Sequence, residues 1–182
     1  PFSYLVKWSE CGASLCQESP ALAQSYFQAS PAVMAKLRSR HIETWAELGL
    51  GLYRGTWKSS TLASRFFAAS PALLSSLTLP ELKQFVAFLG AVSHRSYDLA
   101  AECLALGQKV FPLLGDDKGA FVSLASSTLE TGWRQVKGLF EAAARSLPKV
   151  DAGQRLRFLQ MTDRLRDGGA ANVPAAMLDM SD

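Results

Sequence analysis

The sequence has few of the residues that build redox or metal centres. It contains three cysteines (Cys11, Cys16 and Cys103), no CxxC pair, and only two histidines (His41 and His94). An odd cysteine count without metal-type spacing is typical of reduced thiols in a cytoplasmic protein, and we expect all three to be small buried residues. The histidines fall near expected helix ends, where capping or surface polarity is favoured over catalysis. We therefore predict neither a metal site nor a cofactor.

The motifs of common enzyme classes are also missing. The sequence contains no HExxH, GxSxG, GxxxxGKS or GxGxxG, so we interpret the chain as non-enzymatic, without catalytic residues. No apolar run approaches the roughly 20 residues that a membrane-spanning helix requires. The opening stretch PFSYLVKWSE has neither an initiator Met nor the pattern of a signal peptide. We expect a cytoplasmic fragment of a longer protein, with no membrane contact.

Two acidic stretches keep a metal-binding alternative open. DDKG at 116–119 has adjacent carboxylates without the further ligands of a calcium loop, so a helix cap is favoured. LDMSD at 178–182 resembles the start of the DxSxS metal motif of von Willebrand factor A domains. No apolar strand precedes it, which weighs against a metal ligand set there.

An internal repeat is the strongest signal in the chain. YFQASPAVMAKL at 26–37 and FFAASPALLSSL at 66–77 share six of twelve residues. Large apolar anchors recur at Trp8, Trp45, Phe85, Phe121 and Phe158, so the intervals are 37, 40, 36 and 37 residues. A second set follows the first after 19 residues, or 22 in the unit containing the segment RGTWKSST: Phe27, Phe67, Leu104, Phe140 and Met177. A fixed period of this length predicts a helical repeat.

Each repeat is predicted to contain helices. Apolar or small residues follow the anchors at i+3, i+4 and i+7, and Thr78-Leu79-Pro80-Glu81 fits a capping box. We expect the Ser-Pro pairs at 30–31 and 70–71 to end one helix and cap a short third one. In later units the second helix is expected to reach Pro112 and Pro148. Residues 1–182 should form one all-α domain, a HEAT- or armadillo-like α-solenoid of about five repeats.

Candidate binding residues lie in the extra segment of the second repeat. Trp57 has no place in the repeat pattern and is flanked by Arg54 and Lys58. A loop tryptophan between two cations can anchor a protein partner, and it can also fold back onto its own repeat. Basic clusters at 36–41 and 155–166 lack interleaved aromatic residues that we expect to be exposed, since Phe158 is a repeat anchor. With a net charge of only +3, they favour a solvated edge over a nucleic-acid site.

One family has repeats of this kind. ETWAELGLGL followed by LASRFFAASPALLSSL resembles the helical region of bacterial von Willebrand factor A domain adaptors that work with MoxR-type AAA+ ATPases. The rubisco-activation and nitric oxide reductase activation proteins are examples. The resemblance implies a non-catalytic scaffold that links the ATPase to a client enzyme. We expect a monomer that binds a protein partner; the alternative is a DNA- or RNA-binding repeat module.

Overall fold

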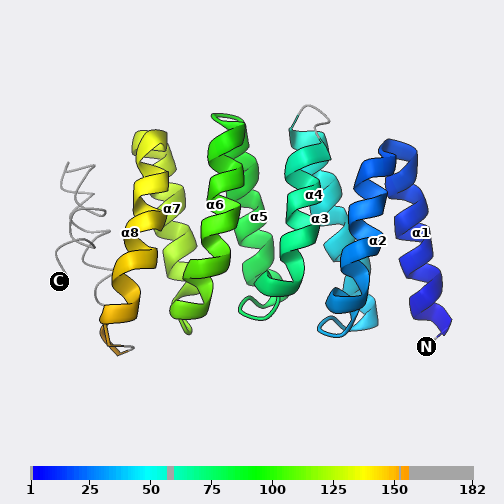
Figure 1. Cartoon of the computed structure of the whole chain (residues 1–182), viewed down its shortest axis with the longest axis horizontal. Helices are drawn as coiled ribbons and strands as arrows, with labels where there is room; N and C mark the ends of the chain where they lie inside the picture. The colour runs from blue at the N-terminus through cyan, green and yellow to red at the C-terminus, as the bar shows by residue number, and fades with distance from the viewer. Residues whose placement is uncertain (1, 57–59, 152, 156–182) are drawn as a thin grey trace. The chain divides into compact units, whose positions relative to one another are not determined.

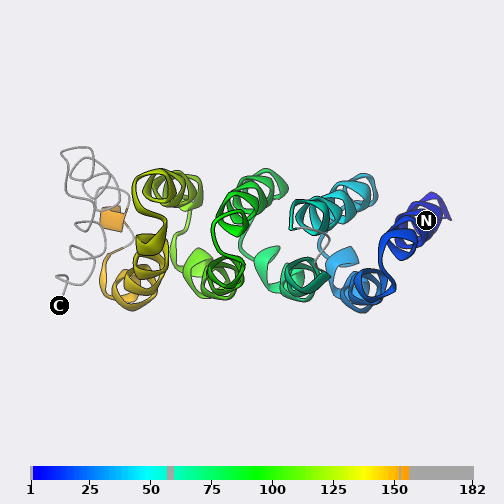
Figure 2. The same ribbon diagram turned by 90° about the horizontal axis from the view of Figure 1, so that it is seen from above.

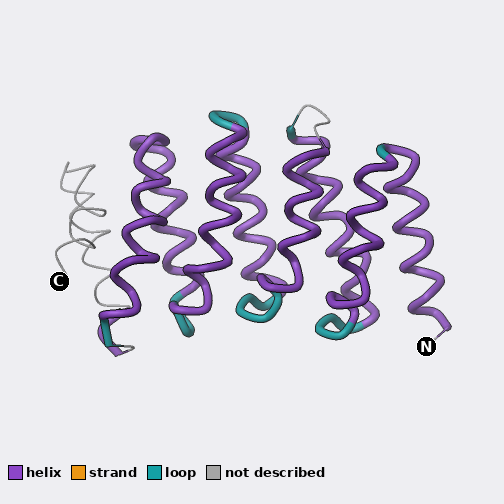
Figure 3. Tube along the Cα trace, viewed as in Figure 1, coloured by secondary structure: helices purple, strands orange, loops and turns teal. Residues whose placement is uncertain are grey.

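The structure is a computed structural model that describes residues 2–56, 60–151 and 153–155. These residues form helices and turns, with no strand among them (Figures 1 and 3). The protein is therefore all-α in the described part, as the sequence predicts. The chain divides into two compact units, Pro1–Ser75 and Ser76–Asp182. No helix among the described residues is both long enough and apolar enough to cross a membrane.

The first unit consists of two helical hairpins. Helices α1 (Phe2–Glu18) and α2 (Pro20–Met34) form one, and α3 (Ile42–Gly55) and α4 (Ser60–Leu73) form the other, after a short 3₁₀ turn at Ser39–His41. Helix α1 also packs on α3, and α2 on α4. The unit therefore has two layers, with α1 and α3 in one and α2 and α4 in the other (Figure 2).

The second unit repeats this order of packing. Its hairpins are α5 (Leu79–Ser93) with α6 (Tyr97–Val110), and α7 (Lys118–Gly132) with α8 (Val136–Ser146). Helix α5 packs on α7 and α6 on α8, which again gives two layers. Short 3₁₀ turns follow α6, α7 and α8 at Phe111–Leu113, Trp133–Gln135 and Leu147–Lys149. The chain therefore stays helical as far as Pro112 and Pro148, as predicted, although the final turn at each end is a 3₁₀ turn rather than part of α6 or α8.

The aromatic anchor residues of a hairpin meet between its two helices, in the buried core except for half-buried Trp8 and exposed Phe27. Ring centroids lie 5.1 Å apart for Trp8 and Phe27, and 5.1 Å for Trp45 and Phe67. The third aromatic pair, Phe121 and Phe140, is 5.0 Å apart, and its rings meet edge to face at 78°. The anchor spacing is therefore the chain length needed to bring facing residues of a hairpin into contact. The last anchors, Phe158 and Met177, lie outside the described residues.

The prediction that Ser-Pro ends a helix is wrong. Helix α2 continues through Pro31 to Met34, and α4 continues through Pro71 to Leu73. The buried hydroxyls of Ser30 and Ser70 each donate a 2.7 Å hydrogen bond to the carbonyl four residues earlier, so neither caps a new helix. Each proline lies in the last turn of its helix and removes one N–H from the ladder, but the hydrogen bonds from Ala35 N–H to the carbonyl of Pro31 and from Leu74 N–H to that of Ser70 continue the helical path. Buried Val33 and Leu73 hold these final turns against the core.

The capping predictions have mixed outcomes. The capping box of Thr78 and Glu81 is present at the start of α5, so that prediction is confirmed. Asp117 occupies the N-cap position of α7, but its side chain makes no capping hydrogen bond. Its φ of −87° and ψ of 9° differ from the extended backbone of a typical N-cap, which aims the side chain at the first helical N–H groups.

The cysteine prediction is confirmed only for Cys103. This thiol is buried, whereas Cys11 is half-buried and Cys16 is exposed. Both of the latter lie on α1, five residues apart and therefore on different faces of the helix. None of the three is in a disulfide.

Candidate functional site

The structure describes only one of the three predicted partner-binding residues. Arg54 lies in the last turn of α3, and its Nη2 atom is 2.6 Å from Oε1 of Glu18 at the end of α1. The neighbouring Tyr53 hydroxyl donates a 3.1 Å hydrogen bond to the carbonyl of Glu18. Arg54 therefore helps to join the ends of two helices. Trp57 and Lys58 lie outside the described residues, and their role as an anchor stays a prediction.

The other polar candidates do not gather into a site. His41 and His94 lie at helix ends, at the N-cap of α3 and the C-cap of α5, and His41 accepts a 3.1 Å hydrogen bond from Nε of Arg40. Among the described residues, no three His, Cys, Asp or Glu side chains are placed to hold a metal ion. The LDMSD segment at 178–182 lies outside that part of the chain.

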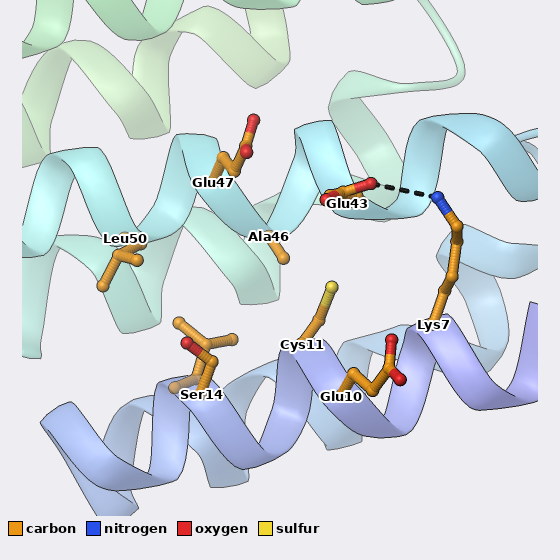
Figure 4. A pocket seen from close by; sticks show the side chains of 9 residues that line it. Lys7, Glu10, Cys11, Ser14, Glu43, Ala46, Glu47 and Leu50 are labelled. Atoms are coloured by element: carbon orange, nitrogen blue, oxygen red, sulfur yellow. Dashed lines mark hydrogen bonds and ion pairs between the residues drawn. The ribbon is translucent and has the colours of Figure 1, made fainter.

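A surface groove runs between α1 and α3 of the first unit (Figure 4). Its volume is 310 Å³. Residues three, four and seven apart share one face of a helix, and both walls follow this spacing. Helix α1 contributes Lys7, Glu10, Cys11, Ser14 and Leu15, and helix α3 contributes Glu43, Ala46, Glu47 and Leu50. We call this feature the α1/α3 groove.

The floor of the α1/α3 groove is apolar, and its rims are charged. Leu15 and Ala46 are buried, and the side chains of Cys11, Ala46 and Leu50 point toward the space between the helices (Figure 4). Glu10 stands on the α1 rim and Glu47 on the outer rim of α3, and both are exposed. This arrangement combines a small hydrophobic contact surface with charges on either side.

One ion pair crosses the groove. Nζ of Lys7 on α1 lies 3.1 Å from Oε2 of Glu43 on α3 (Figure 4). About half of each side chain is exposed, 51% and 55%, so solvent screens the pair and its contribution to stability is small. Its main consequence is electrostatic, because it neutralises the only cation among the groove residues.

The groove has a negative potential that acts on its thiol. Three carboxylates and one ammonium line it. Burial raises the pKa of Cys11, and the charges of Glu43, Glu10 and Glu47 raise it further. Cys11 consequently stays a neutral thiol, which disfavours a nucleophilic role, since the thiolate is the reactive form.

The second unit has a groove at the same register, which we call the α5/α7 groove. It has a volume of 530 Å³ and is lined by Gln84, Ala87, Phe88 and Ala91 of α5 and by Val122, Ser123 and Ser126 of α7. Measured from Trp8 and from Phe85, the first walls use positions −1, +2, +3 and +6. Measured from Trp45 and from Phe121, the second walls share positions +1, +2 and +5.

Comparison with protein-family models, with curated proteins and with solved structures finds no match to this chain. The site is thus defined by its own geometry. Sequence reasoning missed both grooves because it followed the buried anchors rather than the positions beside them. The spacing of those positions from the anchors is the signal that identifies them.

Proposed function

We propose that this chain is a non-catalytic scaffold that binds protein partners through grooves in its first-helix layer. The observation that carries the proposal is the recurrence of a groove at the same anchor-relative positions in both units. Buried anchors use one face of each helix for the core. The neighbouring face is left beside solvent, and grooves between adjacent helices are common sites for a partner helix.

The proposal includes a repeat architecture of the HEAT or armadillo kind, with about five units of about 37 residues. Repeat proteins stack equivalent units, and each unit presents an equivalent surface. The contacts of Trp8 with Phe27 and of Trp45 with Phe67, both at 5.1 Å, support this equivalence. The matching order of helix packing in the two units supports it as well.

The resemblance to adaptors of MoxR-type AAA+ ATPases suggests which proteins to test first. In that role the chain would act in the cytoplasm, as a link between an ATPase and a client enzyme, and it would have no activity of its own. The segment with Arg54, Trp57 and Lys58 would be an additional contact. This part of the proposal depends on the repeat pattern in the sequence.

Site-specific photo-crosslinking tests the scaffold function. A photoreactive amino acid is placed at Ser14 in the α1/α3 groove, at Ser123 in the α5/α7 groove, or at exposed Gln28 on α2 as a control. We expect protein crosslinks in cells at the two groove positions and not at the control. A MoxR-type ATPase or its client among the products would support the adaptor role, and other proteins would restrict the proposal to a scaffold. Absence of crosslinks at both grooves would refute the scaffold.

The nucleic-acid alternative has less support from the α1/α3 groove. Its exposed glutamates repel phosphate groups, whereas nucleic-acid sites concentrate Lys and Arg. Steeply salt-dependent binding of duplex DNA to the 182-residue chain would restore that alternative.

A further inference from the structure

We propose that the α1/α3 groove binds a basic amphipathic helix of a protein partner, with apolar residues on the floor and Lys or Arg over the two rims. The inference rests on the proposed scaffold function and specifies the chemistry of the partner at one groove. Its basis is the charge and the apolar floor of the groove between α1 and α3.

Two glutamates of the α1/α3 groove have no counter-ion among the described residues. Lys7 is engaged with Glu43 at 3.1 Å. None of the salt bridges between described residues includes Glu10 or Glu47. These two carboxylates stand on opposite helices, so one negative charge lies on each side of the groove (Figure 4). A bound segment with cations on both of its flanks would satisfy both charges.

The floor of the α1/α3 groove offers an apolar contact surface. Cys11 and Leu50 are half-buried, and Leu15 and Ala46 are buried beneath them. Such a strip offers contact to apolar side chains from above. A helix with an apolar stripe bordered by basic residues presents both features in the required order, which is the helix-in-groove mode of recognition.

The α1/α3 and α5/α7 grooves differ in the charge of their lining residues. The α5/α7 groove has the same register, but its lining residues carry no charge, with alanines at 87 and 91 and serines at 123 and 126. The charge preference is therefore expected only in the first unit. Glu10 corresponds to Ala87 and Glu47 to Ser123, so the partner chemistry is determined by positions that the core leaves free.

The test uses the complete 182-residue chain and a labelled amphipathic helical peptide of leucine and lysine. A matched peptide with glutamate in place of every lysine is the control probe. Binding is measured by fluorescence anisotropy at low and high salt, because screening weakens exposed charge pairs. We expect the lysine peptide to bind more tightly than the glutamate peptide, and to shift the amide NMR signals of α1 and α3.

Charge reversal locates the interaction. The double variant E10K/E47K should weaken binding of the lysine peptide by about tenfold or more, because like charges replace opposite ones on both rims. The double variant D116K/E130K makes the same change in net charge at exposed positions outside the groove. It should bind the peptide like the parent chain. Circular dichroism checks that both variants are folded.

The outcomes separate this inference from the scaffold function. Equal weakening by both double variants, or tighter binding of the glutamate peptide, would overturn the basic-helix proposal. So would self-association of the chain that E10K/E47K abolishes, because the occupant would then be a second copy. If Ser14 nevertheless forms protein crosslinks in cells, the scaffold stands and only the stated partner chemistry falls.

Discussion

Replacing Gly49 with alanine should destabilise the first unit even though alanine is the better helix former. A Cβ atom at Gly49 would lie 2.1 Å from Cζ of Phe67, and 2.6 and 2.7 Å from two further ring atoms. Carbon atoms in contact are normally about 3.5 Å apart or more. The ring must therefore move by more than an ångström, on the order of the difference between these distances.

The surroundings of Phe67 oppose this movement. The ring is fully buried, and the rings of Trp45, Tyr26 and Phe66 lie within 5.1 to 5.6 Å of its centroid. Overpacking of this kind costs about 1–3 kcal/mol. The gain in helix propensity from glycine to alanine offsets about 1 kcal/mol. We expect a net loss of up to about 2 kcal/mol in the free energy of unfolding.

Two other glycines of the same unit serve as controls. Gly51 lies on the same helix with no atom within 4 Å of an added Cβ, so G51A should stabilise the unit by up to about 1 kcal/mol. At Gly12 the Cβ would lie 2.0 Å from Phe27, but that ring is 38% exposed and can turn outward. G12A should therefore fall between the other two variants.

Urea denaturation followed by circular dichroism and tryptophan fluorescence gives the order of stability. The expected order is G51A, then G12A, then G49A, with about 1–3 kcal/mol between the extremes. If G49A were as stable as G51A, Phe67 would not be held where the structure places it, and the explanation of the aromatic core would be wrong.

Three further changes test other contacts. S70A should lower the free energy of unfolding by about 1–3 kcal/mol, because it leaves the Nε1 donor of buried Trp45 without its 2.9 Å partner. S30A removes only a hydrogen bond within its own helix and should cost less. Equal losses of the two variants in urea denaturation would contradict this. T78A should lower the free energy of unfolding of the second unit by about 1 kcal/mol through loss of the capping box. An unchanged free energy of unfolding would show that the cap contributes nothing. In a background without the other cysteines, changing the three groove glutamates to glutamine should lower the raised pKa of Cys11. Alkylation of Cys11 at a fixed pH should then become faster, and the pH profile of alkylation should move to lower pH. A slower reaction would refute the electrostatic explanation.

The sequence predicted the parts of the fold that large residues control. Large apolar residues such as Trp45 and Phe67 are few in the sequence and recur at similar intervals, so the repeat period is visible. The contact between the two residues follows from that period. The capping box at Thr78 depends only on residues close to it in the chain, so it could also be predicted from the sequence. Local rules failed at Pro31, because buried Val33 and the hydrogen bond from Ser30 to the carbonyl of Tyr26 keep the helix continuous. These contributions come from packing, which local propensity does not include.

The grooves were less predictable for a related physical reason. A position that faces the core must match its neighbours in size, so its residue type repeats from unit to unit. A position beside the core has no such requirement, and Glu10 in one unit corresponds to Ala87 in the other. No repeated residue type marks the groove. Its place can be read only as a fixed distance from the anchors, once the anchors are known to define the helix faces.

This separation of core and groove positions bears directly on function. Because Trp8 and Phe85 hold their hairpins together, the exposed residues at −1, +2 and +6 can change without loss of the fold, whereas +3 in the second unit is the buried Phe88. Lys7, Glu10 and Glu47 in the first unit, against neutral residues in the second, give two grooves with the same register and different charge. In the proposed function, partner specificity resides in exposed positions of this register. Exchanging Glu10 with Ala87 and Glu47 with Ser123 should transfer the preference for a basic helix while the stability of each core is retained, because all four positions are exposed.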